Sequence, residues 1–231
     1  MNGISIKDVS YQINDTVILT EVSFKSDAKR ITVLGRNGSG KSTLSRLICG
    51  LDRPSQGTIH INDIDVYHDR RAALDTIGLI FQNPDHQIIF PTVIEEMIFG
   101  LTQMGIDKSS AVQRAISYLS KFGKSDWHDR AISTLSQGQK KLLCLMAILA
   151  MEPKVIILDE PLAALDIPTQ RQLTQILQSL PQTLIYITHD TTPIQDYDVA
   201  IWLEQGQIVQ TGSPANVLPR FINEMNQIEV L

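Results

Sequence analysis

The sequence has no long apolar run, and this excludes the commonest kind of membrane span. Its longest apolar stretch, LLCLMAILAMEPKVIIL from Leu142, is interrupted by Glu152, Pro153 and Lys154. A transmembrane helix needs about 20 predominantly apolar residues in succession, so we expect a buried helix followed by a buried strand here. The first residues, MNGISIKDVS, also lack the charged-then-apolar pattern of a secretory signal. We therefore expect a soluble chain.

Cysteine is scarce and positive charge is not in excess. Cys49 and Cys144 each lie in an apolar helical pattern, which is typical of buried thiols in a reducing compartment such as the cytosol and not of a disulfide. The formal net charge of −5 disfavours a broad basic face for nucleic acid. The 231 residues, with 43% hydrophobic and 19% charged side chains, suit a globular protein of one domain with a subdomain, or of two small domains.

Strand and helix patterns follow one another in an order that predicts an α/β fold. The beginning is rich in strands, at 4–13, 16–24, 30–35 and 57–66. A helix is expected at 42–51 and a short buried strand at 76–81. Helical periods then continue to about residue 151, for example in 107–123, where apolar residues recur at intervals of three and four. We thus expect an antiparallel β subdomain on the N-terminal side and an inserted α-helical subdomain.

The second half of the chain supplies the remaining strands. KVIILD (154–159) and TLIYIT (183–188) are unbroken apolar runs, which suit parallel strands buried on both faces. A helix at 168–180 separates them. VAIWLEQGQIVQTG (199–212) predicts a hairpin that turns near Gly206, followed by a polar C-terminal helix.

A phosphate-binding loop is the clearest motif. The pattern G-x-x-x-x-G-K-[ST] is matched between a predicted strand and a predicted helix by Gly35, Arg36, Asn37, Gly38, Ser39, Gly40, Lys41 and Ser42, with Thr43 directly after it. In such a loop, backbone N–H groups turn toward a phosphate, the lysine reaches the β- and γ-phosphates, and the hydroxyl of Ser42 can bind Mg²⁺. The sequence therefore predicts a nucleoside phosphate and Mg²⁺ as ligands within a P-loop nucleotide-hydrolase fold.

Two carboxylates end the strand VIILD. Asp159 lies at the carboxyl end of this predicted strand, where it can hold Mg²⁺ through water. Glu160 follows one residue later, where it could act as a general base toward the attacking water. An Asp-Glu pair at a strand end is otherwise often a solvated turn, so the phosphate loop is what favours the catalytic interpretation.

Two further positions have both a structural and a functional interpretation. In LSQGQ (135–139), Ser136 and Gln139 form the pattern of a helix capping box, and the bare backbone at Gly138 would also suit an anion. His189 follows the strand TLIYIT at the edge where ligands bind in such sheets, so it could donate to the γ-phosphate or be incidental.

Together these pieces resemble the ATP-binding-cassette ATPases over about residues 4–218. The resemblance implies a single ATP-binding domain over 1–231, with a nucleotide-binding core at 1–82 and 152–231 and a helical subdomain at 83–151. It further implies a head-to-tail dimer that encloses two ATP molecules, each held by the phosphate loop of one subunit and the LSQGQ segment of the other. The second subunit would be an identical copy or a paired ATPase.

The resemblance also assigns roles to single residues. It makes Glu160 the general base, His189 the switch histidine and Gln82 the residue that senses Mg²⁺ and water. Asp166 would lie in the loop that crosses the dimer interface. Tyr11 would stack on adenine, although ordinary packing explains an aromatic in an early strand equally well.

Three positions depart from the usual pattern of this family, and none removes a phosphate-binding or catalytic group. Gln137 stands where glycine is usual, Lys141 near where many members have arginine, and Ala163 where serine is commoner.

The stretch FQNPDHQIIFPTV (81–93), followed by IEEMIFG, is similar to ATPases of prokaryotic energy-coupling-factor importers. This similarity implies an integral membrane coupling protein and a substrate-binding membrane component as partners, a location on the cytoplasmic face of the cell membrane, and Ile88, Ile89 and Phe90 as part of the docking groove. Biotin is the favoured cargo, and cobalt or nickel the second. Two other classes are disfavoured. A soluble ATPase of this family acting on DNA or ribosomes would need a coiled-coil insertion, a second cassette or a basic face, and a P-loop kinase gives no reason for LSQGQ and His189.

Overall fold

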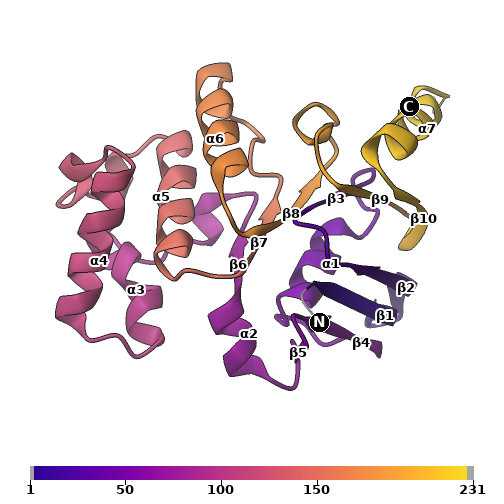
Figure 1. Cartoon of the computed structure of the whole chain (residues 1–231), viewed down its shortest axis with the longest axis horizontal. Helices are drawn as coiled ribbons and strands as arrows, with labels where there is room; N and C mark the ends of the chain where they lie inside the picture. Colours follow the sequence, from indigo (N-terminus) through magenta and orange to yellow (C-terminus); the bar gives the residue numbers. More distant parts are fainter. Residues whose placement is uncertain (1–2, 228–231) are drawn as a thin grey trace. The chain divides into compact units, whose positions relative to one another are not determined.

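The computed structural model describes residues 3–227 (Figure 1). These residues divide into two units. The first unit comprises the described residues up to Ile77, together with Val155–Glu160 and those from Gln182 onward. The second comprises Gly78–Lys154 and Pro161–Pro181. The first two and last four positions of the predicted domain lie outside the described residues.

An antiparallel sheet forms the first part of unit one. Its strands lie in the order β2-β1-β4-β5, with β1 at Ile4–Ile13, β2 at Thr16–Ser26, β4 at Gln56–Ile61 and β5 at Ile64–Asp65. Every pair in it is antiparallel. The antiparallel β subdomain expected from the sequence is confirmed.

A mainly parallel sheet forms the other part of unit one, in the order β10-β9-β3-β8-β7. The strand β3 (Arg30–Leu34) pairs in parallel with β8 (Thr183–Thr188) and β9 (Val199–Glu204), and β7 (Val155–Asp159) pairs in parallel with β8. The hairpin partner β10 (Gln207–Gly212) is antiparallel to β9. Because β7 and β8 are apolar and buried along nearly their whole length, they suit a sheet covered on both faces.

Two α-helices and a 3-10 helix accompany this sheet, in addition to the C-terminal helix. Helix α1 (Lys41–Ile48) follows β3 directly after the phosphate loop, and α2 (Arg70–Thr76) precedes the short strand β6 (Ile77–Ile80), where the units meet in the sequence. The 3-10 helix η4 spans Thr192–Ile194. The sequence did not predict α2, because RRAALDT is only seven residues long and has no repeated apolar face.

The C-terminal helix α7 (Pro214–Gln227) exists as expected, but it is not polar throughout. Val217, Leu218 and Phe221 are buried, and the ring of Phe221 meets that of Trp202 edge to face at 5.6 Å between centroids. One apolar stripe therefore packs α7 against the rest of the first unit.

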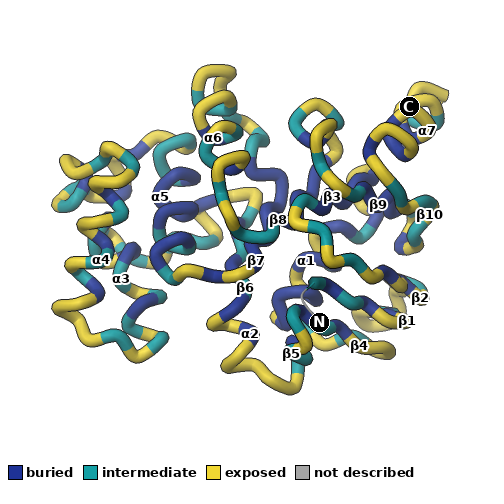
Figure 2. The backbone as a smooth tube through the Cα atoms, viewed as in Figure 1, coloured by how far each residue is buried: buried dark blue, intermediate teal, exposed yellow. Residues whose placement is uncertain are grey.

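Unit two is helical. It contains α3 (Val93–Gln103), α4 (Lys108–Lys121), α5 (Gln137–Ala150) and α6 (Ile167–Ser179), with the 3-10 helices η1 (Pro84–His86), η2 (Ser125–Trp127) and η3 (Ile132–Thr134) between them. Figure 2 shows α5 buried along most of its length. Its core is built from α3, α4 and α5, including Met97, Leu101, Leu119, Leu143 and Met146. Among the described residues, no helix is long and apolar enough to cross a membrane.

Candidate functional site

The phosphate loop connects the end of β3 to the start of α1, as its sequence predicts. Gly40 has a φ of 100°, a left-handed conformation that L side chains rarely adopt. A Cβ atom on Gly35 would lie 2.1 Å from the carbonyl oxygen of Leu203, so no larger residue fits without a shift of the backbone. The hairpin turn braces the loop, because the backbone N–H of Gly206 donates to the carbonyl of Ser39 at 3.1 Å. The loop is therefore fixed on a rigid sheet end.

Lys41 lies inside this loop. Its Nζ donates to the carbonyl oxygens of Gly35 and Arg36, both at 2.8 Å, and the residue is buried. Burial lowers the pKa of Lys41 from its usual value, and the nearby carboxylates of Glu160 and Asp159 oppose that shift. A partly desolvated ammonium group at this place interacts strongly with an anion such as a phosphate.

Asp159 and Ser42 offer oxygen ligands beside the loop. Asp159 is the last residue of β7, and burial raises the pKa of its carboxyl group, while a hydrogen bond with the Ser42 side chain opposes this shift. Its Oδ1 is buried without a hydrogen-bond partner among the described residues, as is Oγ of Ser39 in the loop. A buried carboxylate oxygen without a donor beside a hydroxyl fits a hard cation such as Mg²⁺.

The described residues offer only a few ligands for such a cation. Within residues 3–227, no group of three or more His, Cys, Asp or Glu side chains is placed to hold a metal. Mg²⁺ usually keeps several waters and binds through one or two protein groups plus substrate phosphates. The pair of Ser42 and Asp159 matches that requirement.

Glu160 and His189 form a hydrogen-bonded pair. Oε1 of Glu160 lies 2.7 Å from Nδ1 of His189 and accepts from the backbone N–H of His189 at 3.1 Å. The backbone of Glu160 is left-handed, with a φ of 49°, and its N–H donates to the carbonyl of Ile187 at 2.9 Å. Thr188 Oγ1 contributes a longer contact to Oε2, at 3.5 Å. The end of β8 thus orients the Glu160 carboxylate.

This pairing has a consequence for the proton on the histidine. A carboxylate against Nδ1 favours the ring with its proton on that nitrogen. The neutral ring then offers only an acceptor at Nε2, so His189 can donate to a phosphate from Nε2 only as the imidazolium. The Glu160 side chain is about 10% exposed and that of His189 57%, so the histidine is the member of the pair that faces solvent.

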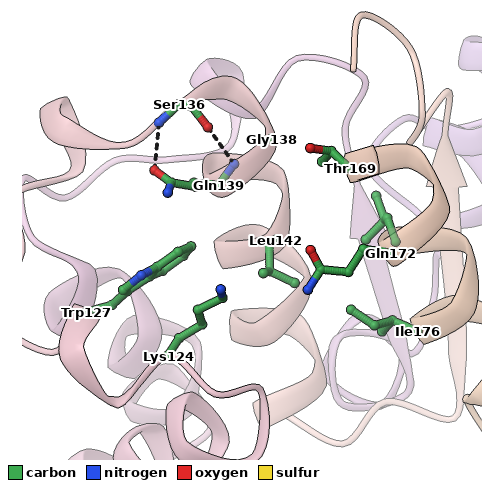
Figure 3. A pocket seen from close by; sticks show the side chains of 10 residues that line it. Lys124, Trp127, Ser136, Gly138, Gln139, Leu142, Thr169, Gln172 and Ile176 are labelled. Atoms are coloured by element: carbon green, nitrogen blue, oxygen red, sulfur yellow. Dashed lines mark hydrogen bonds between the residues drawn. The ribbon is translucent and has the colours of Figure 1, made fainter. Parts of the chain in front are cut away.

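The segment Ser136–Gln139 in unit two begins α5 with the expected capping box. Ser136 Oγ accepts from the backbone N–H of Gln139 at 3.3 Å, and Gln139 Oε1 accepts from the backbone N–H of Ser136 at 3.0 Å (Figure 3). A Cβ atom on Gly138 would lie 2.8 Å from Cγ2 of Thr169 on α6, so glycine lets the two helices approach closely.

A cavity of about 230 Å³ opens beside this segment. In Figure 3, the amine of Lys124 and the amide of Gln172 point toward Leu142, and the indole of Trp127 forms a further wall. The cavity therefore joins polar groups to an apolar floor. Its lining residues are Lys124, Trp127, Ser136, Gly138, Gln139, Leu142, Thr169, Gln172, Leu173 and Ile176.

The remaining predicted site residues are placed as follows. Tyr11 is half-buried in β1, opposite Leu19 of β2. Gln82 is exposed directly after β6, in the β6–α3 loop (residues 81–92). Asp166 caps α6, since its Oδ1 accepts from the backbone N–H of Thr169 at 2.9 Å, and this bonding with Thr169 lowers the pKa of its carboxyl group.

The predicted residues thus fall into two groups. Unit one brings together the phosphate loop, Asp159, Glu160 and His189 at the carboxyl ends of its parallel strands, and it also contains Tyr11. Unit two contains Gln82, Ser136, Gly138, Gln139 and Asp166.

Lys141 has a position that its sequence did not reveal. It is buried on α5, and its Nζ donates to the carbonyl oxygens of Pro161 at 3.1 Å and Ala163 at 2.7 Å. These carbonyls lie between Glu160 and Asp166 in the sequence. The only signal was a charged residue on the apolar face of a predicted helix.

Comparison with known proteins gives a consistent result. The family model described as "ABC transporter" matches residues 19–163. The chain is 46% identical to the biotin transport ATP-binding protein BioM of Rhodobacter capsulatus, over 99% of this chain and 97% of that protein. It is 35% identical to the energy-coupling factor transporter ATP-binding protein EcfA1 of Leuconostoc mesenteroides, over 94% of this chain and 83% of that protein.

A solved structure has the same fold. CbiO1 from Clostridium perfringens, described as part of the ABC transporter complex CbiONQ, superposes with a TM-score of 0.81 at 29% identity. The match covers 96% of this chain and 94% of CbiO1.

Proposed function

The chain belongs to the ABC transporter family, and we propose that it is the ATP-hydrolysing subunit of an energy-coupling-factor importer that takes up biotin. The family match covers more than half of the chain, and members of this family bind ATP and couple its hydrolysis to transport. The observation that carries the proposal of cargo is the 46% identity to BioM over 99% of the chain. The similarity to EcfA1, an energy-coupling factor transporter ATP-binding protein, and to CbiO1, part of a CbiONQ complex, supports a paired ATPase and membrane components as partners.

The geometry of unit one supports a specific division of labour. Backbone N–H groups of residues 35–43 and the ammonium of Lys41 bind the β- and γ-phosphates. Ser42 and Asp159 would hold Mg²⁺, which supplies charge neutralisation at the phosphates. Tyr11 would stack on the adenine ring.

Glu160 is the proposed general base. Its carboxylate is fixed by the backbone and Nδ1 of His189, so it can accept a proton from a water aligned on the γ-phosphate. His189 in its imidazolium form stabilises negative charge on the phosphate from Nε2. In the proposed head-to-tail dimer, Ser136 and Gly138 of the second subunit contact the γ-phosphate at the start of α5, Gln139 caps that helix start, and Asp166 lies at the interface.

Replacement of the proposed base tests this chemistry. We expect Glu160→Gln to retain ATP binding, to lose at least about 10²-fold in turnover, and to accumulate an ATP-bound dimer measurable by light scattering. Asp27→Asn, a neutralised carboxylate at an exposed position of the same unit, serves as the control with unchanged turnover. Hydrolysis by Glu160→Gln near the parent rate would show that another group is the base.

Purification from the native membrane tests the proposed assembly. A tag on this chain should recover integral membrane partners, and these should bind biotin. Recovery of partners that bind cobalt or nickel would select the second cargo expected from the sequence. Recovery of no membrane protein would contradict the importer.

A further inference from the structure

The β6–α3 loop is held in place by hydrogen bonds to backbone groups at both of its ends. Gln87 Oε1 accepts from the backbone N–H of Phe81 at 3.1 Å. Glu96 of α3, a buried carboxylate, accepts with Oε2 from the backbone N–H groups of Ile89 at 3.0 Å and Phe90 at 3.1 Å. These hydrogen bonds hold the loop in one defined conformation.

Asp85 connects the middle of this loop to the start of α5. Its Oδ1 accepts from Nζ of Lys140 at 2.6 Å, and its Oδ2 accepts from Nε2 of Gln137 at 2.9 Å. Asp85 is itself oriented, because its backbone N–H donates to Oδ1 of Asn83 at 3.0 Å. Both oxygens of one carboxylate are thus engaged by residues more than fifty positions away in the chain.

One donor lies within the segment proposed to contact ATP, and the other directly follows it. Gln137 is the first residue of α5 and Lys140 is three positions further, so both face the same side of the first helical turn. Gly138 and Gln139 lie between them. A carboxylate at this place also interacts favourably with the positive end of the helix.

We propose that Asp85, Gln137 and Lys140 form a positioning link that couples the conformation of the β6–α3 loop to that of Ser136–Gln139. This inference deepens the proposed function and rests on it for its role: a membrane partner that moves the loop would also move the phosphate-contacting segment. Gln137, which stands where glycine is usual in the family, is the residue that makes the second contact, because glycine has no side-chain donor. Asp85, Gln137 and Lys140 would act by positioning the Ser136–Gln139 segment and not by contacting the nucleotide themselves.

An exchange of charges tests the link in the isolated chain. We compare the parent with Asp85→Lys, Lys140→Asp and the double variant, using hydrogen exchange of backbone amides. Each single variant should raise exchange by about two- to fivefold in both the β6–α3 loop and the first turn of α5, as expected for loss of an exposed ion pair. The double variant should restore protection in both segments, because the side-chain amide of Gln137 can donate or accept and so pairs with either sign of charge.

The matched control is Asp126→Lys, which makes the same change of charge at an exposed position of unit two. It should leave exchange in both segments unchanged. A change confined to one of the two segments, or a double variant no better than the worse single variant, overturns the link. This arm uses only the isolated protein, so its result does not depend on the proposed cargo.

The second arm measures coupling in the complex purified with its membrane partners and placed in liposomes. The single variants should lose at least about threefold in biotin taken up per ATP hydrolysed, and the double variant should recover most of that ratio. A ratio equal to the parent's in both single variants overturns the coupling role. If the parent complex itself takes up no biotin, the proposed function fails, and the exchange experiment still decides whether the link exists.

Discussion

The most demanding prediction concerns Lys141, whose ammonium group lies buried between α5 and the segment after Glu160. Replacement by methionine keeps an unbranched side chain that is one atom shorter and removes the donor to the carbonyls of Pro161 and Ala163. Hydrogen bonds to a charged group contribute about 1.5–3 kcal/mol each, and removal of a buried ammonium regains several kcal/mol of desolvation. We expect Lys141→Met to lower the free energy of unfolding by about 2 kcal/mol, because two carbonyls lose their donor.

Thermal unfolding and steady-state hydrolysis both report on this change. For a chain of this size, about 2 kcal/mol corresponds to a melting temperature lower by about 4–8 °C. Because Pro161 directly follows Glu160, we also expect kcat to fall at least about tenfold through misplacement of the base, while the KM for ATP changes little.

Two further variants make the result specific. Lys141→Arg should retain most of the stability and turnover, because a guanidinium group also donates to carbonyls. Lys108→Met, at an exposed position of α4, should change neither quantity. If Lys141→Met melts within about 1 °C of the parent, the contacts of Lys141 with Pro161 and Ala163 do not stabilise the segment after Glu160.

Three other experiments test the tight packing and the burial of single residues. Gly35→Ala should weaken ATP binding at least about tenfold in titration calorimetry, because its Cβ would lie 2.1 Å from the carbonyl of Leu203; unchanged affinity would show that the loop is not rigid. Burial raises the pKa of the Asp159 carboxyl group in the folded state above its value in the unfolded state. Ionisation of Asp159 therefore lowers the free energy of unfolding at pH values above the folded-state pKa, and this destabilisation vanishes as the pH falls below the unfolded-state pKa. Asp159→Asn should therefore raise the melting temperature of nucleotide-free protein at about pH 8, less so at about pH 4, while abolishing Mg²⁺-dependent hydrolysis; a lower melting temperature at the higher pH would contradict this sign. Burial raises the pKa of Cys49 and Cys144 to about 12, so neither thiol should react with maleimide in the native protein at about pH 8, and rapid labelling would show that the thiols are accessible.

Much of the fold was predictable because its strongest elements are locally determined. The strand at 183–188 and the hairpin at Gly206 were placed from apolar runs and a turn glycine, and β8, β9 and β10 agree with them. The helix expected at 107–123 is α4, which begins where Asp107 caps it and ends at Lys121. Local signals sufficed for these elements because periodicity, caps and turn residues all favoured the same structure.

The features that the sequence did not predict depend mainly on contacts between distant residues. Helix α2 has no repeated apolar face. The apolar stripe of α7 is defined by a contact between distant residues, the packing of Phe221 against Trp202. The link from Asp85 to α5 and the carbonyl contacts of Lys141 span 20 to 55 positions, and no local pattern specifies which charge will meet which partner. Glu160 and His189 were each expected at a strand end, but their direct pairing and the left-handed backbone of Glu160 were not.

The proposed role of this chain in biotin import can be measured as uptake of labelled biotin by liposomes that contain the complex purified through this chain. ATP and Mg²⁺ are supplied on the side that carries the ATPase. We predict uptake that requires hydrolysable ATP and that is lost in Glu160→Gln. Hydrolysis of ATP by the parent complex without accumulation of biotin would show that this chain does not power biotin import.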